Sequence, residues 1–93
     1  MNIALITGAS SGMGRDFVIG ADKRYNLDEI WVVARREDRL LALQQECKAK
    51  IVPLALDLTD SASLEIIKTK LKSETPNVKL LVNASGFGKM AEF

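Results

Sequence analysis

The sequence contains no histidine and only one cysteine, Cys47. Histidine is the commonest general base and the commonest metal ligand in proteins, so its absence excludes a Ser-His-Asp triad. One cysteine cannot form an internal disulfide and is too few for a cysteine-rich zinc site. We therefore predict no metal site and no hydrolase of the triad type.

Long apolar runs and an excess of one charge are also missing. The apolar start, Ile3 to Ile6, has no basic flank and reaches Gly8 within a few residues, so we expect neither a signal peptide nor a membrane span. The 13 Lys and Arg residues nearly balance the 12 Asp and Glu residues, which leaves a net charge of +1. This balance gives no reason to expect nucleic acid or a membrane surface as a partner. A cytoplasmic location is the default expectation.

What is present is the composition of a packed globular chain, with 47% apolar residues, 27% charged residues and two prolines. A length of 93 residues suffices for one modest domain, but not for a cofactor domain together with a separate substrate domain. We therefore expect a single domain over residues 1–93.

Short apolar runs alternate along the chain with segments of helical periodicity. Runs typical of buried strands cover residues 3–7, 30–34, 51–56 and 80–82. Helical spacing follows each of the first three runs, in residues 13–21, in residues 37–48, and behind the capping candidates Thr59, Asp60 and Ser61. This alternation predicts right-handed crossovers and an α/β fold with a doubly wound parallel sheet.

Pro53 adds information on the order of the strands. A proline cannot donate a hydrogen bond to the sheet, so the strand of residues 51–56 is expected at an edge. That placement agrees with the Rossmann-like strand order 3-2-1-4, in which the chain steps outward through three strands and then returns beside the first.

A glycine-rich segment, Thr7-Gly8-Ala9-Ser10-Ser11-Gly12-Met13-Gly14, joins the first strand to the first helix. Glycines let the backbone turn sharply and approach a ligand closely, and the helix that follows offers unpaired N–H groups to an anion. A pyrophosphate fits such a site. A flexible turn that binds nothing is the alternative, but the position between a buried strand and a helix favours a dinucleotide.

This segment resembles the glycine motif of the short-chain dehydrogenase/reductase family. Three further positions agree with the resemblance: Arg35 after the second strand, Asp57-Leu58 after the third, and the stretch from Asn83 to Gly86 after the fourth. The similarity thus covers the whole chain, and it implies a bound NADP(H). The predicted cofactor-binding residues are Gly8, Ser10, Ser11, Gly12, Met13, Gly14, Arg35, Arg36, Asp57, Leu58, Asn83, Ala84, Ser85 and Gly86.

Arg35 and Arg36 stand about 20 residues beyond the glycine segment, where an acidic residue would bind the ribose 2′-hydroxyl of NAD. Cations at a helix N-terminus oppose the helix dipole, so helix stability gives no reason for two of them there. A bound 2′-phosphate would account for two cations at this position. The alternative is that both are solvated charges paired with nearby acidic residues. By the resemblance, Arg35 confers a preference for NADP, with Arg36 and Arg15 in support.

Asp57 has two interpretations, because an Asp after a strand is most often a turn or capping residue. The resemblance instead assigns the adenine edge to the Asp57 side chain and to the backbone N–H of Leu58. The stretch Asn83-Ala84-Ser85-Gly86 resembles the family's Asn-Asn-Ala-Gly, but Ala84 replaces the second Asn. The geometry near the nicotinamide ribose is therefore the least determined part of the prediction.

Members of this family transfer hydride between the cofactor and a carbonyl or alcohol substrate. In their Tyr-x-x-x-Lys motif, the tyrosine is the general acid/base and the lysine lowers its pKa. A phenol, with a reference pKa near 10, needs a cationic neighbour to exchange protons near neutral pH. The only tyrosine, Tyr25, has no lysine four residues later and is expected at the end of the first helix, away from the ligand. We therefore assign no catalytic residue.

Two hypotheses remain open. The chain is either the NADP(H)-binding part of an oxidoreductase whose catalytic residues are not among these 93, or a binding or sensing module without chemistry. On the first hypothesis, the fold is truncated after the fourth strand, and we predict that the chain is inactive by itself. The fourth strand would then present an unpaired edge and an uncovered face, which predicts a homo-oligomer formed through that strand and the third helix.

Overall fold

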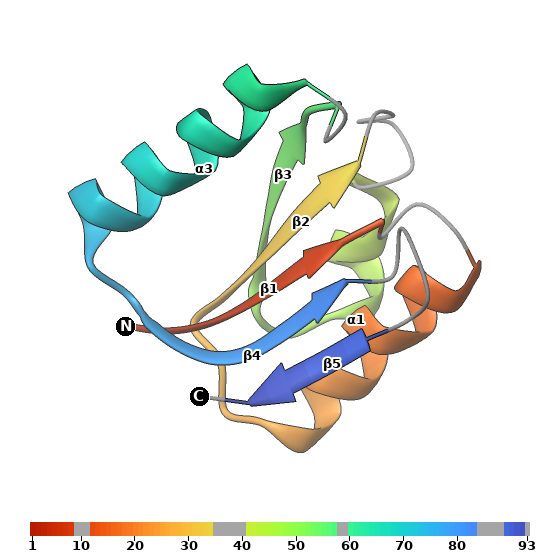
Figure 1. Cartoon of the computed structure of the whole chain (residues 1–93). Coiled ribbons are helices and arrows are strands. Elements are labelled where there is room, and N and C mark those ends of the chain that lie inside the picture. The colour runs from red at the N-terminus through yellow and green to blue at the C-terminus, as the bar shows by residue number, and fades with distance from the viewer. Residues whose placement is uncertain (9–11, 35–40, 58–59, 84–88, 93) are drawn as a thin grey trace.

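The described residues form a five-stranded sheet with helices on both faces (Figure 1). The computed structural model describes residues 1–8, 12–34, 41–57, 60–83 and 89–92, of which 12–13, 83 and 89–92 are described by their backbone alone. The strand order is β3-β2-β1-β4-β5. The strands are β1 (Asn2–Thr7), β2 (Glu29–Ala34), β3 (Lys50–Ala55), β4 (Asn77–Asn83) and β5 (Lys89–Glu92), and the helices are α1 (Gly12–Arg24), the 3-10 turn η1 (Leu43–Glu46) and α3 (Ser61–Glu74).

The first four strands are parallel, which confirms the predicted doubly wound class and the order 3-2-1-4. Pro53 lies on β3, opposite Val32 of β2, and β3 is an edge strand of the sheet as expected. Its missing N–H therefore costs no hydrogen bond on the outer side.

The pleat of the sheet divides the apolar side chains between two faces. On one face, Ile6 and Val32 join the buried cluster that includes Val18 of α1 and Leu43 of η1. On the other face, Trp31 and its neighbours pack with Ile67 of α3. The first two crossovers thus cover one face and the third covers the other, as predicted for a right-handed doubly wound sheet.

The end of the second crossover differs from its prediction. A helix was expected as far as Lys48. In the structure, the helical residues of this crossover end with the 3-10 turn η1 at Glu46, and Cys47 is extended, with φ −123° and ψ 146°. The reason is a competing hydrogen bond, because Asp22 accepts the backbone N–H groups of Lys48 and Ala49, both at 2.9 Å. Those N–H groups are therefore not available for a further helical turn.

The outer edge of β4 also differs from the prediction. The strand was expected to leave its edge unpaired, but β5 pairs antiparallel with Leu80–Asn83. The antiparallel β5 returns alongside β4 (Figure 1). Self-association through this edge is therefore not available along these residues, because their backbone groups already have partners.

Helix α3 is closed at both ends by specific groups. Asp60, one of the three predicted capping residues, accepts the N–H of Ala62 at 3.0 Å and so caps the first turn. At the other end Thr75 adopts the left-handed conformation, with φ 43° and ψ 51°, and its N–H donates to the carbonyl of Leu71. Pro76 follows and prevents the helix from continuing.

Candidate cofactor-binding edge of the sheet

The carboxyl ends of the parallel strands meet along one edge of the sheet. Thr7 of β1 is paired in register with Val33 of β2 on one side and with Asn83 of β4 on the other. Ala34 of β2 is paired with Ala55 of β3. Ligands of doubly wound sheets bind in the crevice outside these strand ends, at the point where the strand order reverses. Here the order reverses between β1 and β4, beside Thr7 and Asn83.

Gly8 makes the turn out of β1. Its φ is 74°, a conformation that costs a side-chain-bearing residue energy but costs glycine nothing. Its N–H donates to the carbonyl of Val33 at 2.7 Å, which extends the contact between β1 and β2 by one residue. Thr7, which sequence reasoning did not select, donates from its hydroxyl to the carbonyl of Val82 at 3.4 Å. The turn is thus joined to both neighbouring strands.

Helix α1 begins at Gly12, four residues beyond this turn. Its first turn contains no acidic residue, so no carboxylate of that turn competes for the N–H groups at its start. Met13 and Gly14 lie in the same turn. Gly8 in the left-handed conformation and a helix whose first turn has no carboxylate are suited to an anionic group such as a pyrophosphate.

Arg15 lies in this first turn and pairs with Glu46 of η1. Both side chains are about half exposed. The supporting role expected for Arg15 at the 2′-phosphate would require it to exchange this partner for the phosphate. A surface ion pair of this kind contributes about 0–1 kcal/mol, so the exchange would be inexpensive.

Asp57 follows β3 at the same edge. Leu56 donates its N–H to the carbonyl of Ala34 at 3.0 Å, and the carbonyl of Asp57 accepts the N–H of Asp60 at 3.0 Å. The cap of α3 is Asp60 and not Asp57. The exposed Asp57 therefore belongs to a turn that connects the strand end directly to the start of α3.

Several predicted cofactor residues lie outside the described residues, and no position is assigned to them: Ser10, Ser11, Arg35, Arg36, Leu58, Ala84, Ser85 and Gly86. Of the remainder, the structure brings Gly8, Gly12, Met13, Gly14, Asp57 and Asn83 to the carboxyl edge through their strands and helix. Tyr25 follows α1 at the opposite end of that helix and packs against the core, so it is not at this edge.

The thiol of Cys47 has a pKa well above its ordinary value. Its partial burial, followed by the nearby carboxylates of Asp22 and Glu46, raises the pKa of the thiol to about 11, although Arg15 acts in the opposite direction. The thiol is therefore protonated at neutral pH and is a poor nucleophile. No group of three potential metal ligands occurs in the described part of the chain, and none of its helices is long and apolar enough to cross a membrane.

The fold and this edge define a dinucleotide-binding α/β domain, and comparison with known proteins identifies its family. The family model described as short chain dehydrogenase matches residues 2–93, so the chain belongs to the short-chain dehydrogenases, a family of oxidoreductases. A short chain dehydrogenase of Pseudocercospora fijiensis is 36% identical in an alignment 90 residues long, which covers 94% of this chain and 28% of that protein.

Solved structures show the same relationship. The bulky-bulky ketone specific alcohol dehydrogenase from Comamonas testosteroni has a TM-score of 0.74 and 33% identity, and the match covers 98% of this chain and 38% of that one. L-Sorbose reductase from Gluconobacter frateurii, solved with NADPH and L-sorbose, has a TM-score of 0.74 and 28% identity, with coverage of 94% and 34%. The chain thus spans about a third of the length of these relatives.

Proposed function

We propose that this chain is the NADP(H)-binding part of an oxidoreductase that transfers hydride between NADPH and a carbonyl or alcohol substrate. The observation that carries the proposal is the turn at Gly8, which joins a buried parallel strand to a helix whose first turn lacks carboxylates. That combination offers backbone N–H groups and the positive end of a helix dipole to a pyrophosphate. Membership of the short-chain dehydrogenases supports the same function.

The preference for NADP over NAD rests on the two arginines that follow β2 in the sequence. Ala34 ends β2 at the cofactor edge, and Arg35 and Arg36 come directly after it. A guanidinium group can donate two hydrogen bonds to a phosphate, which makes arginine suited to a 2′-phosphate. The related L-sorbose reductase was solved with NADPH, which supports NADP as the cofactor.

The other cofactor contacts are proposed from the same edge. Asp57 and the N–H of Leu58 would hold the adenine, because they follow the strand next to β2. Asn83 and residues 84–86 would lie beside the nicotinamide half, because β4 is on the opposite side of β1. Ser10, Ser11, Gly12, Met13 and Gly14 would surround the pyrophosphate between these two halves.

Bound NADPH would supply the hydride, and this chain would bind and orient it. The 93 residues contain no Tyr-x-x-x-Lys pair to transfer the proton. We therefore expect cofactor binding by this chain, and no turnover of aldehydes or ketones by the chain alone.

The test is a titration with NADPH and NADH by calorimetry, on the wild type and on Arg35→Ala. We expect the wild type to prefer NADPH, and Arg35→Ala to lose about tenfold or more of its affinity for NADPH with little change for NADH. Arg24→Ala is the matched control, because Arg24 is an exposed arginine at the far end of α1. Equal affinity for both cofactors, or equal effects of the two substitutions, would contradict the assignment of Arg35.

A further inference from the structure

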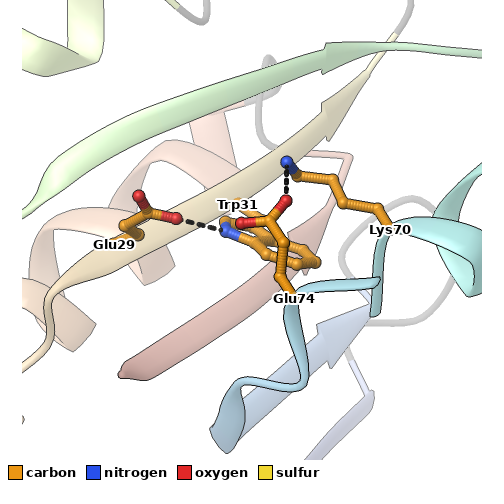
Figure 2. A network of polar contacts seen from close by, with 4 residues as sticks. All are labelled: Glu29, Trp31, Lys70 and Glu74. Atoms are coloured by element: carbon orange, nitrogen blue, oxygen red, sulfur yellow. Dashed lines mark hydrogen bonds and ion pairs between the residues drawn. The ribbon is translucent and has the colours of Figure 1, made fainter. Parts of the chain in front are cut away.

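Lys70 of α3 lies over a buried tryptophan of the sheet. Its ammonium nitrogen is 4.7 Å from the centroid of the Trp31 ring, and Trp31 is completely buried. The indole N–H of Trp31 donates to the carboxylate of Glu29 at 2.9 Å, and Lys70 also pairs with Glu74 one helical turn further on. Figure 2 shows the four side chains between the helix and the sheet.

This contact adds to the apolar contacts that Ile67 and the partly buried Leu71 make with the sheet. Only Ser63 and Ile67 are buried in the whole of α3, while Leu64 and Ile66 are about half exposed. The Lys70 side chain is 26% exposed, so its charge is partly withdrawn from water and faces the aromatic ring. A cation thus occupies a position where an amphipathic helix normally places an apolar residue.

Backbone hydrogen bonds link the start of α3 to the turn at Asp57 on the cofactor edge. The helix begins at Ser61, directly after Asp60, and the N–H of Asp60 donates to the carbonyl of Asp57. The N–H of Ser63 donates in turn to the carbonyl of Asp60. A rigid helix that changes its angle on the sheet therefore also moves the turn that carries Asp57.

We propose that Lys70 is a positioning residue for the adenine end of the cofactor. By docking α3 over Trp31, it fixes the turn at Asp57 in the place where the adenine binds. This inference rests on the proposed function, because it requires that Asp57 contacts the nucleotide.

The test compares Lys70→Met, which keeps the length of the side chain and removes its charge, with Lys70→Arg, which restores a cation. Lys72→Met is the matched control, because Lys72 is an exposed lysine of the same helix. Lys70→Gln is a second neutral variant in case the methionine disturbs folding. Affinities are measured for NADPH, for adenosine 2′,5′-bisphosphate, which carries only the adenosine half, and for reduced nicotinamide mononucleotide, which lacks adenine.

We expect Lys70→Met to weaken NADPH and adenosine 2′,5′-bisphosphate equally, by about fivefold, and to leave the mononucleotide unchanged. Lys70→Arg should bind within about twofold of the wild type, and Lys72→Met should not differ from it. Amide exchange in α3 should be faster in Lys70→Met than in the wild type, because the helix is held less firmly against the sheet. In an Asp57→Asn background, Lys70→Met should cost clearly less than fivefold in affinity, because one of the groups that it positions is already altered.

Two results would overturn the inference while leaving the proposed function intact. One is unchanged NADPH affinity in both Lys70→Met and Lys70→Gln. The other is a full fivefold loss from Lys70→Met in the Asp57→Asn background. Failure of the wild type to bind either NADPH or the bisphosphate would instead contradict the proposed function, and with it the role of Lys70.

Discussion

The two faces of the sheet are built from the same strands but packed to different degrees. The face under α1 buries residues from four strands, from α1 and from η1, in one continuous cluster. The face under α3 has a smaller buried cluster, and beside it lies a hollow of about 480 Å³ lined by Leu5, Leu71, Val78 and Leu81, among others. A single helix cannot cover the whole of one sheet face, so the two faces should respond differently to equivalent substitutions.

The largest difference should come from matched isoleucines on the two faces. Ile6 is completely buried in the cluster under α1, and Ile67 of α3 is 7% exposed. We expect Ile6→Ala to lower the free energy of unfolding by about 3–4 kcal/mol and Ile67→Ala by about 2 kcal/mol, because the side chains beside the hollow can relax into the space. Urea unfolding followed by circular dichroism measures both. Equal losses would show that the two faces are equally well packed.

Two aspartates that accept backbone N–H groups provide a polar version of the comparison. Asp22, in the last turn of α1, is buried and accepts two N–H groups, whereas Asp60 is exposed and accepts one at the start of α3. Asp22→Ala should cost about 2–3 kcal/mol, since it leaves two N–H groups without partners near the core, and Asp60→Ala should cost about 1 kcal/mol. A larger loss in the free energy of unfolding for Asp60→Ala than for Asp22→Ala, in the same urea assay, would contradict this prediction.

Thr75 offers a gain in stability on the α3 side. It is a β-branched residue in the left-handed conformation, which is strained for any residue that carries a Cβ and least so for glycine. Relief of the strain at this position should raise the free energy of unfolding of Thr75→Gly by about 1 kcal/mol. The extra entropy of glycine in the unfolded chain offsets part of this gain. Thermal unfolding is the measurement, with Ser73→Gly, inside the same helix, as the control that should destabilise.

Cys47 should report on the packing of the α1 side without affecting stability at neutral pH, where its thiol is protonated in both states. Its pKa of about 11 in the folded protein lies above that of an unfolded thiol, near 8.5. Between these two values the unfolded chain releases a proton that the folded chain retains, so this residue makes stability fall as the pH rises through that window.

The same shift predicts slow alkylation of Cys47. Iodoacetamide at pH 8 should react with the folded protein about a hundredfold more slowly than with the urea-unfolded chain, because the thiolate is rare. Equal rates in the folded and unfolded protein would show that the thiol is solvated and that the packing of η1 is looser than described.

Most of the fold was predictable because it depends on local patterns. Buried apolar runs predicted the four parallel strands, and Pro53 predicted the edge position of β3. Asp60 was among the predicted caps of α3. The early end of the second crossover was not predictable, because it depends on Asp22, which is 26 residues from Lys48 in the sequence. The pairing of β5 with β4 follows no local pattern that we recognised.

The candidate site was predictable to a similar extent. The glycine motif located the turn at Gly8 and the start of α1, since glycine spacing reflects a backbone requirement. The roles of Thr7 and Lys70 were missed. A lysine on a helix is usually solvated, and nothing in the sequence alone indicates that this one faces Trp31 across the interface with the sheet.

The central claim is that NADPH binds at the carboxyl edge of the parallel strands. The most direct measurement is an amide chemical-shift titration of the ¹⁵N-labelled chain with NADPH. We predict the largest changes at Gly8, Gly12, Arg35 and Asp57, and none at Asp28, Ala49 or Asn77, which lie near the amino ends of the strands. Changes concentrated at the amino ends, or in the hollow beside α3, would contradict the account.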